Sequence, residues 1–249
     1  MSFVEVQLHG GIATVVLECG RVNALNPVVV EELAATFNIL QSDTAVSAVV
    51  LTGRGKFFSF GFDIPEFLSY TREQFTNYLT RFTTLYRNLF IYPKPLVAAL
   101  NGHAIAGGCM IALACDSAIM AQGSAKISLN EIKFGSSLFA GSTEMLQFRT
   151  GGSRASDVVY SGAMYSPEEA QEIGLVAEVV NLETLLDRAR EIAGELGSRR
   201  PAAFASIKSL LRKPVADEMA AREAASIHEF VDIWYSEPTW TNLRSITIR

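Results

Sequence analysis

Cysteine and histidine are both scarce in this sequence of 249 residues. The three cysteines, Cys19, Cys109 and Cys115, are odd in number and sparsely spaced, so a disulfide framework is not expected. We instead expect three reduced, mostly buried thiols in a reducing compartment, which predicts a cytoplasmic location. The three histidines are too scattered to provide the spacing of a metal site, so no metal is predicted.

The chain also lacks long apolar runs and an excess of positive charge. No stretch of about 18 uninterrupted apolar residues occurs, so no membrane span is expected. Residues 1–6 carry no basic segment followed by an apolar run, so a secretory signal is not expected either. The formal net charge of −5 argues against binding to nucleic acid, which requires a basic surface. It leaves room for a small anionic ligand held by a few local lysines.

The hydrophobic content of 49% and the charged content of 19% are typical of a folded globular protein. A chain of this length fits one large α/β domain or two small ones. In its first half, predicted strands alternate with predicted helices, which implies parallel strands joined by crossovers. The predicted strands are Val4–Leu8, Ile12–Leu17, Ala48–Thr52, Leu96–Leu100, Ser117–Ala121 and Ala125–Leu129, and the predicted helices are Asn26–Gln41, Thr71–Phe90 and Gly107–Ala114.

The second half of the chain is mainly helical, with one predicted strand at Val176–Val180. The glycine-rich residues 151–154 are interpreted as a loop and not as a domain linker. A helical region therefore follows an α/β core. The helices predicted here are Ser142–Thr150, Arg154–Ser161, Pro167–Ile173, Glu183–Leu196, Pro201–Leu211 and Ala216–Tyr235.

Two glycine-containing stretches, Phe57–Ile64 and Asn101–Cys109, carry most of the functional information. In each, glycine stands where a predicted strand gives way to a loop or a helix, which allows a sharp turn and close approach of a ligand to a main-chain N–H. One N–H from each stretch, directed at one point, would hold a carbonyl oxygen that becomes negative during a reaction. Neither stretch matches a dinucleotide-binding fingerprint, and either one alone is more typical of an ordinary turn.

Taken together and in this order, the stretches resemble the crotonase (enoyl-CoA hydratase/isomerase) superfamily. The resemblance implies an α/β fold with a repeated ββα spiral core, assigned to residues 1–195. It also implies a helical C-terminal region at residues 196–249 that assembles a trimer or a hexamer, and an acyl-CoA thioester as substrate without a separate cofactor. The similarity covers nearly the whole chain through the segments Phe58–Ile64, Asn101–Cys109, Ala114–Asp116, Leu129–Gly135, Ser161–Gly162 and Ala170–Val176.

The resemblance assigns roles to individual residues of both stretches. The N–H groups of Phe62 and Gly107 would form an oxyanion hole for the thioester oxygen, worth about 3–4 kcal/mol per donor. Lys56 and Arg54 are candidates for contact with the CoA phosphates, and solvated loop charges are the alternative interpretation of both. Asp63 is expected to organise its loop and not to perform chemistry. The remaining candidates for substrate contact are Phe60, Gly61, Ile64, Gly108 and Met110.

The number of candidate carboxylates separates the reactions of this family. Its hydratases use two glutamates, and the first lies three residues after the oxyanion glycine. Here that position is Met110, whose thioether can neither hold a proton nor orient water strongly. The position of the second glutamate is matched by Glu131. Its neighbours Phe134, Leu138 and Phe139 are expected to desolvate the carboxylate and to raise its pKa.

A single carboxylate suits the transfer of a proton from one carbon atom to another. We therefore predict a Δ3,Δ2-enoyl-CoA isomerase of fatty acid metabolism, in which Glu131 moves a proton from C2 to C4 of the substrate. One alternative is a 2-enoyl-CoA hydratase, which would need a second acid such as Glu144. Another is a non-catalytic acyl-CoA-binding subunit. A dienoyl-CoA isomerase is disfavoured, because the second acid of such enzymes would fall at Phe139.

Overall fold

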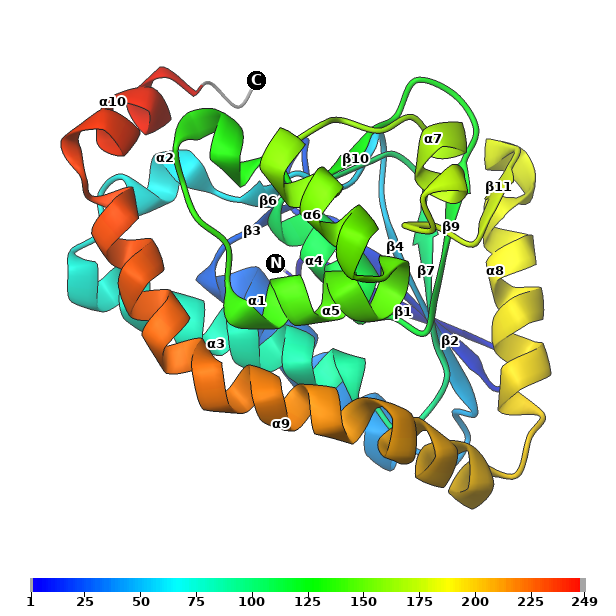
Figure 1. Cartoon of the computed structure of the whole chain (residues 1–249). Coiled ribbons are helices and arrows are strands. Elements are labelled where there is room, and N and C mark those ends of the chain that lie inside the picture. Colours follow the sequence, from blue (N-terminus) through cyan, green and yellow to red (C-terminus); the bar gives the residue numbers. More distant parts are fainter. Residues whose placement is uncertain (1, 247–249) are drawn as a thin grey trace.

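The computed structural model describes residues 2–246, which form an α/β fold with three β-sheets (Figure 1). The largest sheet has six strands in the order β1-β2-β4-β7-β9-β11, where β1 and β2 are antiparallel and all other neighbours are parallel. A parallel sheet has the order β10-β8-β5, and β3 pairs with β6. The strand bounds are β1 Val4–His9, β2 Ile12–Leu17, β3 Ala24–Leu25, β4 Ala48–Gly53, β5 Phe57–Ser59, β6 Gly61–Phe62, β7 Leu96–Leu100, β8 His103–Ile105, β9 Ser117–Ala121, β10 Ile127–Ser128 and β11 Glu178–Val180.

The helices of the first half begin at side chains suited to cap them. Asn26 accepts a hydrogen bond from the Val29 N–H at the start of α1, and Thr71 forms a capping box with Gln74 at the start of α3. Within residues 2–246, no helix is long and apolar enough to cross a membrane. The helix bounds are α1 Pro27–Ser42, α2 Ile64–Phe67, α3 Arg72–Phe90, α4 Gly107–Ala114, the 3₁₀ turn η1 Glu131–Phe134, α5 Ala140–Thr150, α6 Gly152–Ser161, α7 Pro167–Glu172, α8 Leu182–Gly197, α9 Pro201–Trp234 and α10 Glu237–Ser245.

Three successive turns of the chain repeat one arrangement: a strand of the six-stranded sheet, a strand of the three-stranded sheet, and then a helical segment. β4 is followed by β5 and then α2, β7 by β8 and α4, and β9 by β10 and η1. Equivalent strands of successive turns pair with each other in both sheets, so the turns stack as a spiral. The expected ββα spiral core is therefore confirmed.

Alternate residues of the large sheet pack on its two faces, as the period of a strand requires. Ala48 and Val50 of β4 belong to a small apolar cluster with Ala189 of α8, which covers one face. Val49 and Leu51 of the same strand belong to the main core, to which α1, α3 and α4 also contribute. The sheet thus lies between α8 and the other helices (Figure 1).

α9 is one helix of 34 residues, so the predicted break between residues 211 and 216 is wrong. Pro214 lies inside this helix and removes the hydrogen bond that the Leu210 carbonyl would normally accept. Leu210 is 77% exposed, so water can reach this part of the helix. The helix continues because buried residues hold it on both sides of the proline, Lys208 before it and Met219 after it.

Asp116 anchors the first half of α9 to the core. Its carboxylate lies 2.7 Å from Nζ of Lys208 and 3.4 Å from Nη2 of Arg212, and all three side chains are nearly buried. Arg212 also donates to the carbonyls of Phe90 and Ala114, which end α3 and α4. Since helix C-termini carry a partial negative charge, these carbonyls stabilise the buried guanidinium.

Candidate active site

The two glycine-containing stretches and Glu131 come together because each follows a strand of the three-stranded sheet. β5, β8 and β10 are parallel neighbours, so their carboxyl ends lie at one edge of that sheet. β5 leads into Gly61, β8 leads into Gly107 at the start of α4, and β10 leads into Glu131 at the start of η1. The carboxyl edge of parallel strands is where α/β folds commonly bind ligands.

The main chains of the two stretches are in direct contact at Gly61. A Cβ atom on this residue would lie 2.8 Å from the Ile105 carbonyl oxygen and 2.9 Å from the Gly107 nitrogen, closer than real Cβ contacts. Gly61 also has φ +91°, a conformation that side chains other than glycine rarely adopt. Its absent side chain therefore allows Phe62 and Gly107 to lie side by side.

Gly107 provides a main-chain donor at the start of a helix. It is the first residue of α4, and the N–H groups of a first turn have no carbonyl acceptor within their helix. The partial positive charge of a helix N-terminus favours an anion there. The preceding Ala106 has φ +49° and ψ −116°, which costs a residue with a side chain about 1–3 kcal/mol. The Ala106 N–H donates to the Ser128 carbonyl at 2.8 Å, so β10 holds this strained residue in place.

Three polar side chains that sequence reasoning did not assign brace the first stretch, of which Asn23 and Ser59 are buried and Asn101 is half-buried. Asn23 and Asn101 both donate to the carbonyl of Phe57, at 2.8 and 3.3 Å. The hydroxyl of Ser59 donates to the Asn23 carbonyl at 2.7 Å and accepts from the Gly61 N–H at 3.1 Å. Asn23 has φ +50°, a conformation that asparagine tolerates better than most residues. The sequence signal for this bracing role was the position of Asn23 directly before the short strand β3.

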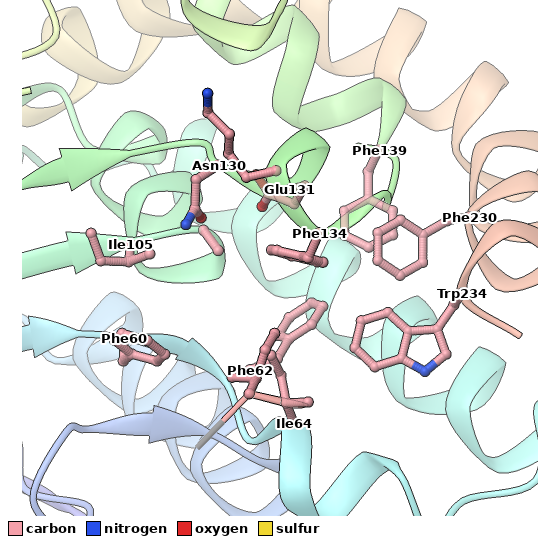
Figure 2. Close-up of a pocket in the computed structure, with 13 residues that line it drawn as sticks. Phe60, Phe62, Ile64, Ile105, Asn130, Glu131, Phe134, Phe139, Phe230 and Trp234 are labelled. Atoms are coloured by element: carbon pink, nitrogen blue, oxygen red, sulfur yellow. The ribbon is translucent and has the colours of Figure 1, made fainter. Parts of the chain in front are cut away.

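A cavity of about 280 Å³, here called the aromatic cavity, opens beside the two stretches (Figure 2). Figure 2 shows Phe60, Ile105 and Asn130 near one end, and Phe230 and Trp234 at the other. Glu131 lies between these ends, across the cavity from Phe62 (Figure 2). The residues that line the aromatic cavity are Phe60, Phe62, Ile64, Ile105, Ala106, Asn130, Glu131, Lys133, Phe134, Phe139, Phe230, Trp234 and Ile246.

In the part of the chain that the structure describes, no other side chain pairs with the Glu131 carboxyl in the wall of the aromatic cavity. Glu131 is 4% exposed, and within residues 2–246 no group forms a hydrogen bond with its Oε2 atom. Burial raises the pKa of this carboxyl to about 8, which confirms the expected direction. Phe134 and Phe139 line the same cavity, whereas Leu138 is absent from the lining and packs against the core. A carboxyl group with this pKa can both take up and release a proton near neutral pH.

The aromatic residues of α3 lie behind the cavity and not in its wall. Tyr78 and Phe82 pack edge-on against the ring of Phe62, with centroid distances of 5.3 and 4.9 Å. The Tyr78 hydroxyl donates to the Leu25 carbonyl, and its burial raises the pKa of the phenol well above its ordinary value. α3 therefore holds Phe62 in position, while α9 supplies the far wall.

Six of the predicted site residues are absent from the cavity lining, namely Lys56, Gly61, Asp63, Gly107, Gly108 and Met110. Met110 is 1% exposed within α4. A Cβ atom on Gly108 would lie 2.3 Å from the Ser59 carbonyl oxygen, so this glycine allows α4 to pack against β5. Asp63 caps α2 by accepting a hydrogen bond from the Glu66 N–H at 3.3 Å, which organises the loop as expected.

The charged candidates are distributed around the site. Arg54 is paired with Glu18 at 2.7 Å, and both Arg54 and Lys56 border a surface depression separate from the aromatic cavity. Glu144, the candidate second acid, lies 2.6 Å from Nη1 of Arg222 and is absent from the lining of the aromatic cavity. Of the residues that line this cavity in the described part of the chain, only Glu131 carries a carboxylate.

Residues 7–238 match the family described as enoyl-CoA hydratase/isomerase. The chain belongs to this family. It is therefore a crotonase-family acyl-CoA enzyme, and the resemblance stated from its motifs is confirmed. The family description covers both hydratases and isomerases, so the reaction of a member depends on the acids and bases around its site.

The known relatives include both hydratases and an isomerase. The 2,3-dehydroadipyl-CoA hydratase of Escherichia coli (strain K12) is 34% identical over 199 residues, which cover 77% of this chain and 74% of that protein. The mitochondrial enoyl-CoA hydratase of Pongo abelii is 33% identical over 232 residues, covering 92% and 78%. The crystal structure of human mitochondrial Δ3,Δ2-enoyl-CoA isomerase has a TM-score of 0.94 and 26% identity, with 98% of this chain and 96% of that chain covered.

Proposed function

We propose that this enzyme is a Δ3,Δ2-enoyl-CoA isomerase that uses Glu131 as its only acid-base group. The observation that carries the proposal is the isolation of Glu131 in the aromatic cavity, since no second carboxylate lines that cavity in residues 2–246. The position at which hydratases of the family place their other glutamate is occupied by the buried Met110. A single buried carboxyl suits a proton transfer between two carbon atoms better than the addition of water.

In the proposed reaction, the Glu131 carboxylate takes a proton from C2 of a 3-enoyl thioester. The electron pair moves onto the thioester oxygen, where the N–H groups of Phe62 and Gly107 stabilise the dienolate. Protonated Glu131 then returns the proton to C4, and the double bond moves from C3–C4 to C2–C3. No atom is gained or lost, and the reaction requires no cofactor besides the coenzyme A of the substrate. The product is conjugated with the thioester and is therefore favoured.

A hydratase is the second candidate, because the curated relatives named above are hydratases. The two reactions separate when the protein is incubated with a 3-enoyl-CoA and, in parallel, with a 2-enoyl-CoA. We expect the 3-enoyl-CoA to be converted to the conjugated isomer, and the 2-enoyl-CoA to be hydrated slowly or not at all. Efficient hydration without isomerisation would overturn the proposal. Turnover of neither substrate above the level of Glu131→Gln would favour a non-catalytic acyl-CoA-binding subunit.

The dependence of the isomerisation rate on pH should follow the ionisation of the buried Glu131 carboxyl. Burial raises the pKa of Glu131 to about 8, and the base must be ionised before it can take the C2 proton. We therefore expect kcat/KM to rise about tenfold per pH unit between pH 6 and 7.5, and to level off above pH 8. Initial rates with a 3-enoyl-CoA between pH 6 and 9 measure this directly. A profile that is flat from pH 6 upward would show that the base titrates well below this range.

Gly61→Ala should disrupt the proposed oxyanion hole. The added methyl group would lie 2.9 Å from the Gly107 nitrogen, so the two stretches must move apart. A displacement of about 1 Å can cost on the order of a hundredfold in rate, and we expect kcat to fall by that factor. Gly152→Ala is the matched control, because its methyl group would meet nothing within 4 Å. Equal kcat values for both variants would exclude a role for the contact at Gly61.

The remaining assignments stay predictions. We infer that coenzyme A lies toward the end of the aromatic cavity that holds Phe60 and Ile105, with Lys56 as a candidate for its phosphates. We also propose that residues 196–249 assemble a trimer or a hexamer, and that the spiral core ends at residue 195. A cytoplasmic location is part of the same proposal. Light scattering of the purified protein would test the assembly.

A further inference from the structure

The far end of the aromatic cavity is closed by three aromatic side chains. Phe139, Phe230 and Trp234 are 0%, 1% and 1% exposed although they line the cavity, so they separate it from solvent. The rings of Phe139 and Phe230 lie 4.5 Å apart, and those of Phe230 and Trp234 lie 5.7 Å apart. Phe75 packs behind Trp234 at 4.7 Å. The rings of Phe139, Phe230 and Trp234, which lie at one end of the cavity in Figure 2, are here called the aromatic end wall.

The aromatic end wall is held in place by contacts between α9 and α5. Phe230 and Trp234 are four residues apart, so they lie on one side of α9. One turn before Phe230, Ser226 accepts a hydrogen bond from the Ala140 N–H at 3.0 Å, and two turns before it the buried Glu223 accepts one from the Gly141 N–H at 3.4 Å. Both donors belong to the first turn of α5, directly after Phe139. The position of the wall is therefore coupled to the first turn of α5.

The cavity volume limits what can fit in front of this wall. A volume of about 280 Å³ holds roughly nine groups of the size of a water molecule, at about 30 Å³ each. If the thioester group lies between Glu131 and Gly107, as the proposed function requires, it occupies part of this space. The remaining groups are about four to six carbon atoms of the acyl chain, which would point toward Phe230 and Trp234.

We propose that the enzyme selects short acyl chains with about four to six carbon atoms beyond the thioester group, and that Trp234 is the residue that limits their length. The inference rests on the proposed function only for the orientation of the acyl-CoA. A longer chain would meet the Trp234 ring, which cannot retreat because Phe75 packs behind it. Trp234 is thus a specificity-determining residue that takes no part in proton transfer.

Calorimetric titration with saturated acyl-CoA esters of 2 to 16 carbons tests the proposal without any turnover. We expect the affinity to rise about fourfold per added methylene group up to about six carbons, and then to fall. In Trp234→Ala the optimum should move to chains two to four carbons longer, and in Trp234→Phe it should move less. Met219→Ala is the matched control, because Met219 is 0% exposed on the same helix but does not line the cavity. This variant should keep the length optimum of the wild type.

Two results would overturn the proposal. One is a wild-type affinity that keeps rising to 16 carbons, and the other is an unchanged optimum in every folded Trp234 variant. The wild-type series and Trp234→Phe keep the test available even if Trp234→Ala does not fold. The two proposals can fail separately. If the isomerase assignment is wrong, the enzyme will not convert 3-enoyl-CoA, but the binding of acyl-CoA esters will still depend on chain length.

Discussion

Replacement of Glu131 by glutamine is expected to lower kcat for isomerisation by about 10³–10⁴-fold and, at the same time, to stabilise the fold. The amide has nearly the same shape as the carboxyl group, so the aromatic cavity should keep its form. It cannot accept the C2 proton, and no other carboxylate lines the cavity in the described residues 2–246. The loss should therefore appear in kcat and much less in the binding of acyl-CoA.

The expected gain in stability follows from the raised pKa of Glu131. Its ordinary value of 4.5 applies to the unfolded chain, whereas burial raises the pKa to about 8 in the native state. Between these values the native protein holds a proton that the unfolded chain has lost, so the free energy of unfolding falls as the pH rises. At pH 7 the buried carboxyl lowers the free energy of unfolding by up to about 3 kcal/mol. An amide does not titrate, so the glutamine variant avoids this loss. Calorimetry should show a higher Tm for Glu131→Gln at pH 8 and little difference at pH 4.

Glu144→Gln is the matched control for this substitution. Its carboxylate is paired with Arg222 and is absent from the cavity lining, so kcat should stay within about threefold of the wild type. Equal losses in the two variants would indicate chemistry with two acids, as in a hydratase. A Glu131→Gln variant with normal kcat would leave the proposed mechanism without its base.

Asp116→Ala is expected to lower the free energy of unfolding by about 3–5 kcal/mol, the largest effect on stability among these predictions. The substitution leaves Lys208 and Arg212 without the carboxylate that lies 2.7 and 3.4 Å from their nitrogen atoms. Both cations are nearly buried, so water cannot replace the lost partner at low cost. Denaturation by urea, monitored by circular dichroism, measures the change.

An exposed ion pair on the same helix provides the control for Asp116. Lys213 and Asp217 lie 2.7 Å apart and are more than 60% exposed, so Asp217→Ala should change the unfolding midpoint little. If Asp116→Ala cost no more than Asp217→Ala, the buried triad would not be what holds α9 to the core. Its loss should also loosen the aromatic end wall, because α9 carries Phe230 and Trp234.

The longer elements were predictable because their signals are local. The predicted strands Val4–Leu8 and Ile12–Leu17 correspond to β1 and β2, and the predicted helices that begin at Asn26 and Thr71 correspond to α1 and α3. β10 lies within the predicted strand Ala125–Leu129, whereas β5, β6 and β8 have only two or three residues and pairing partners distant in the sequence. No local pattern distinguishes such strands from loops. At Pro214 a local signal is present but is overridden. Proline normally breaks a helix, but tertiary contacts keep α9 continuous through it.

By itself, the sequence determined the family, the ββα order of the core and the residue types at the positions proposed to react. Gly61, Gly107 and Glu131 are identified by motif and spacing, and so is the methionine in place of a second glutamate. Only the tertiary structure decided that Glu131 is isolated with a pKa near 8, and that Trp234, more than 100 residues away, closes the cavity in front of it. The physical reason is that residue type and spacing are local properties, whereas desolvation and cavity shape depend on side chains that only the folded chain brings together.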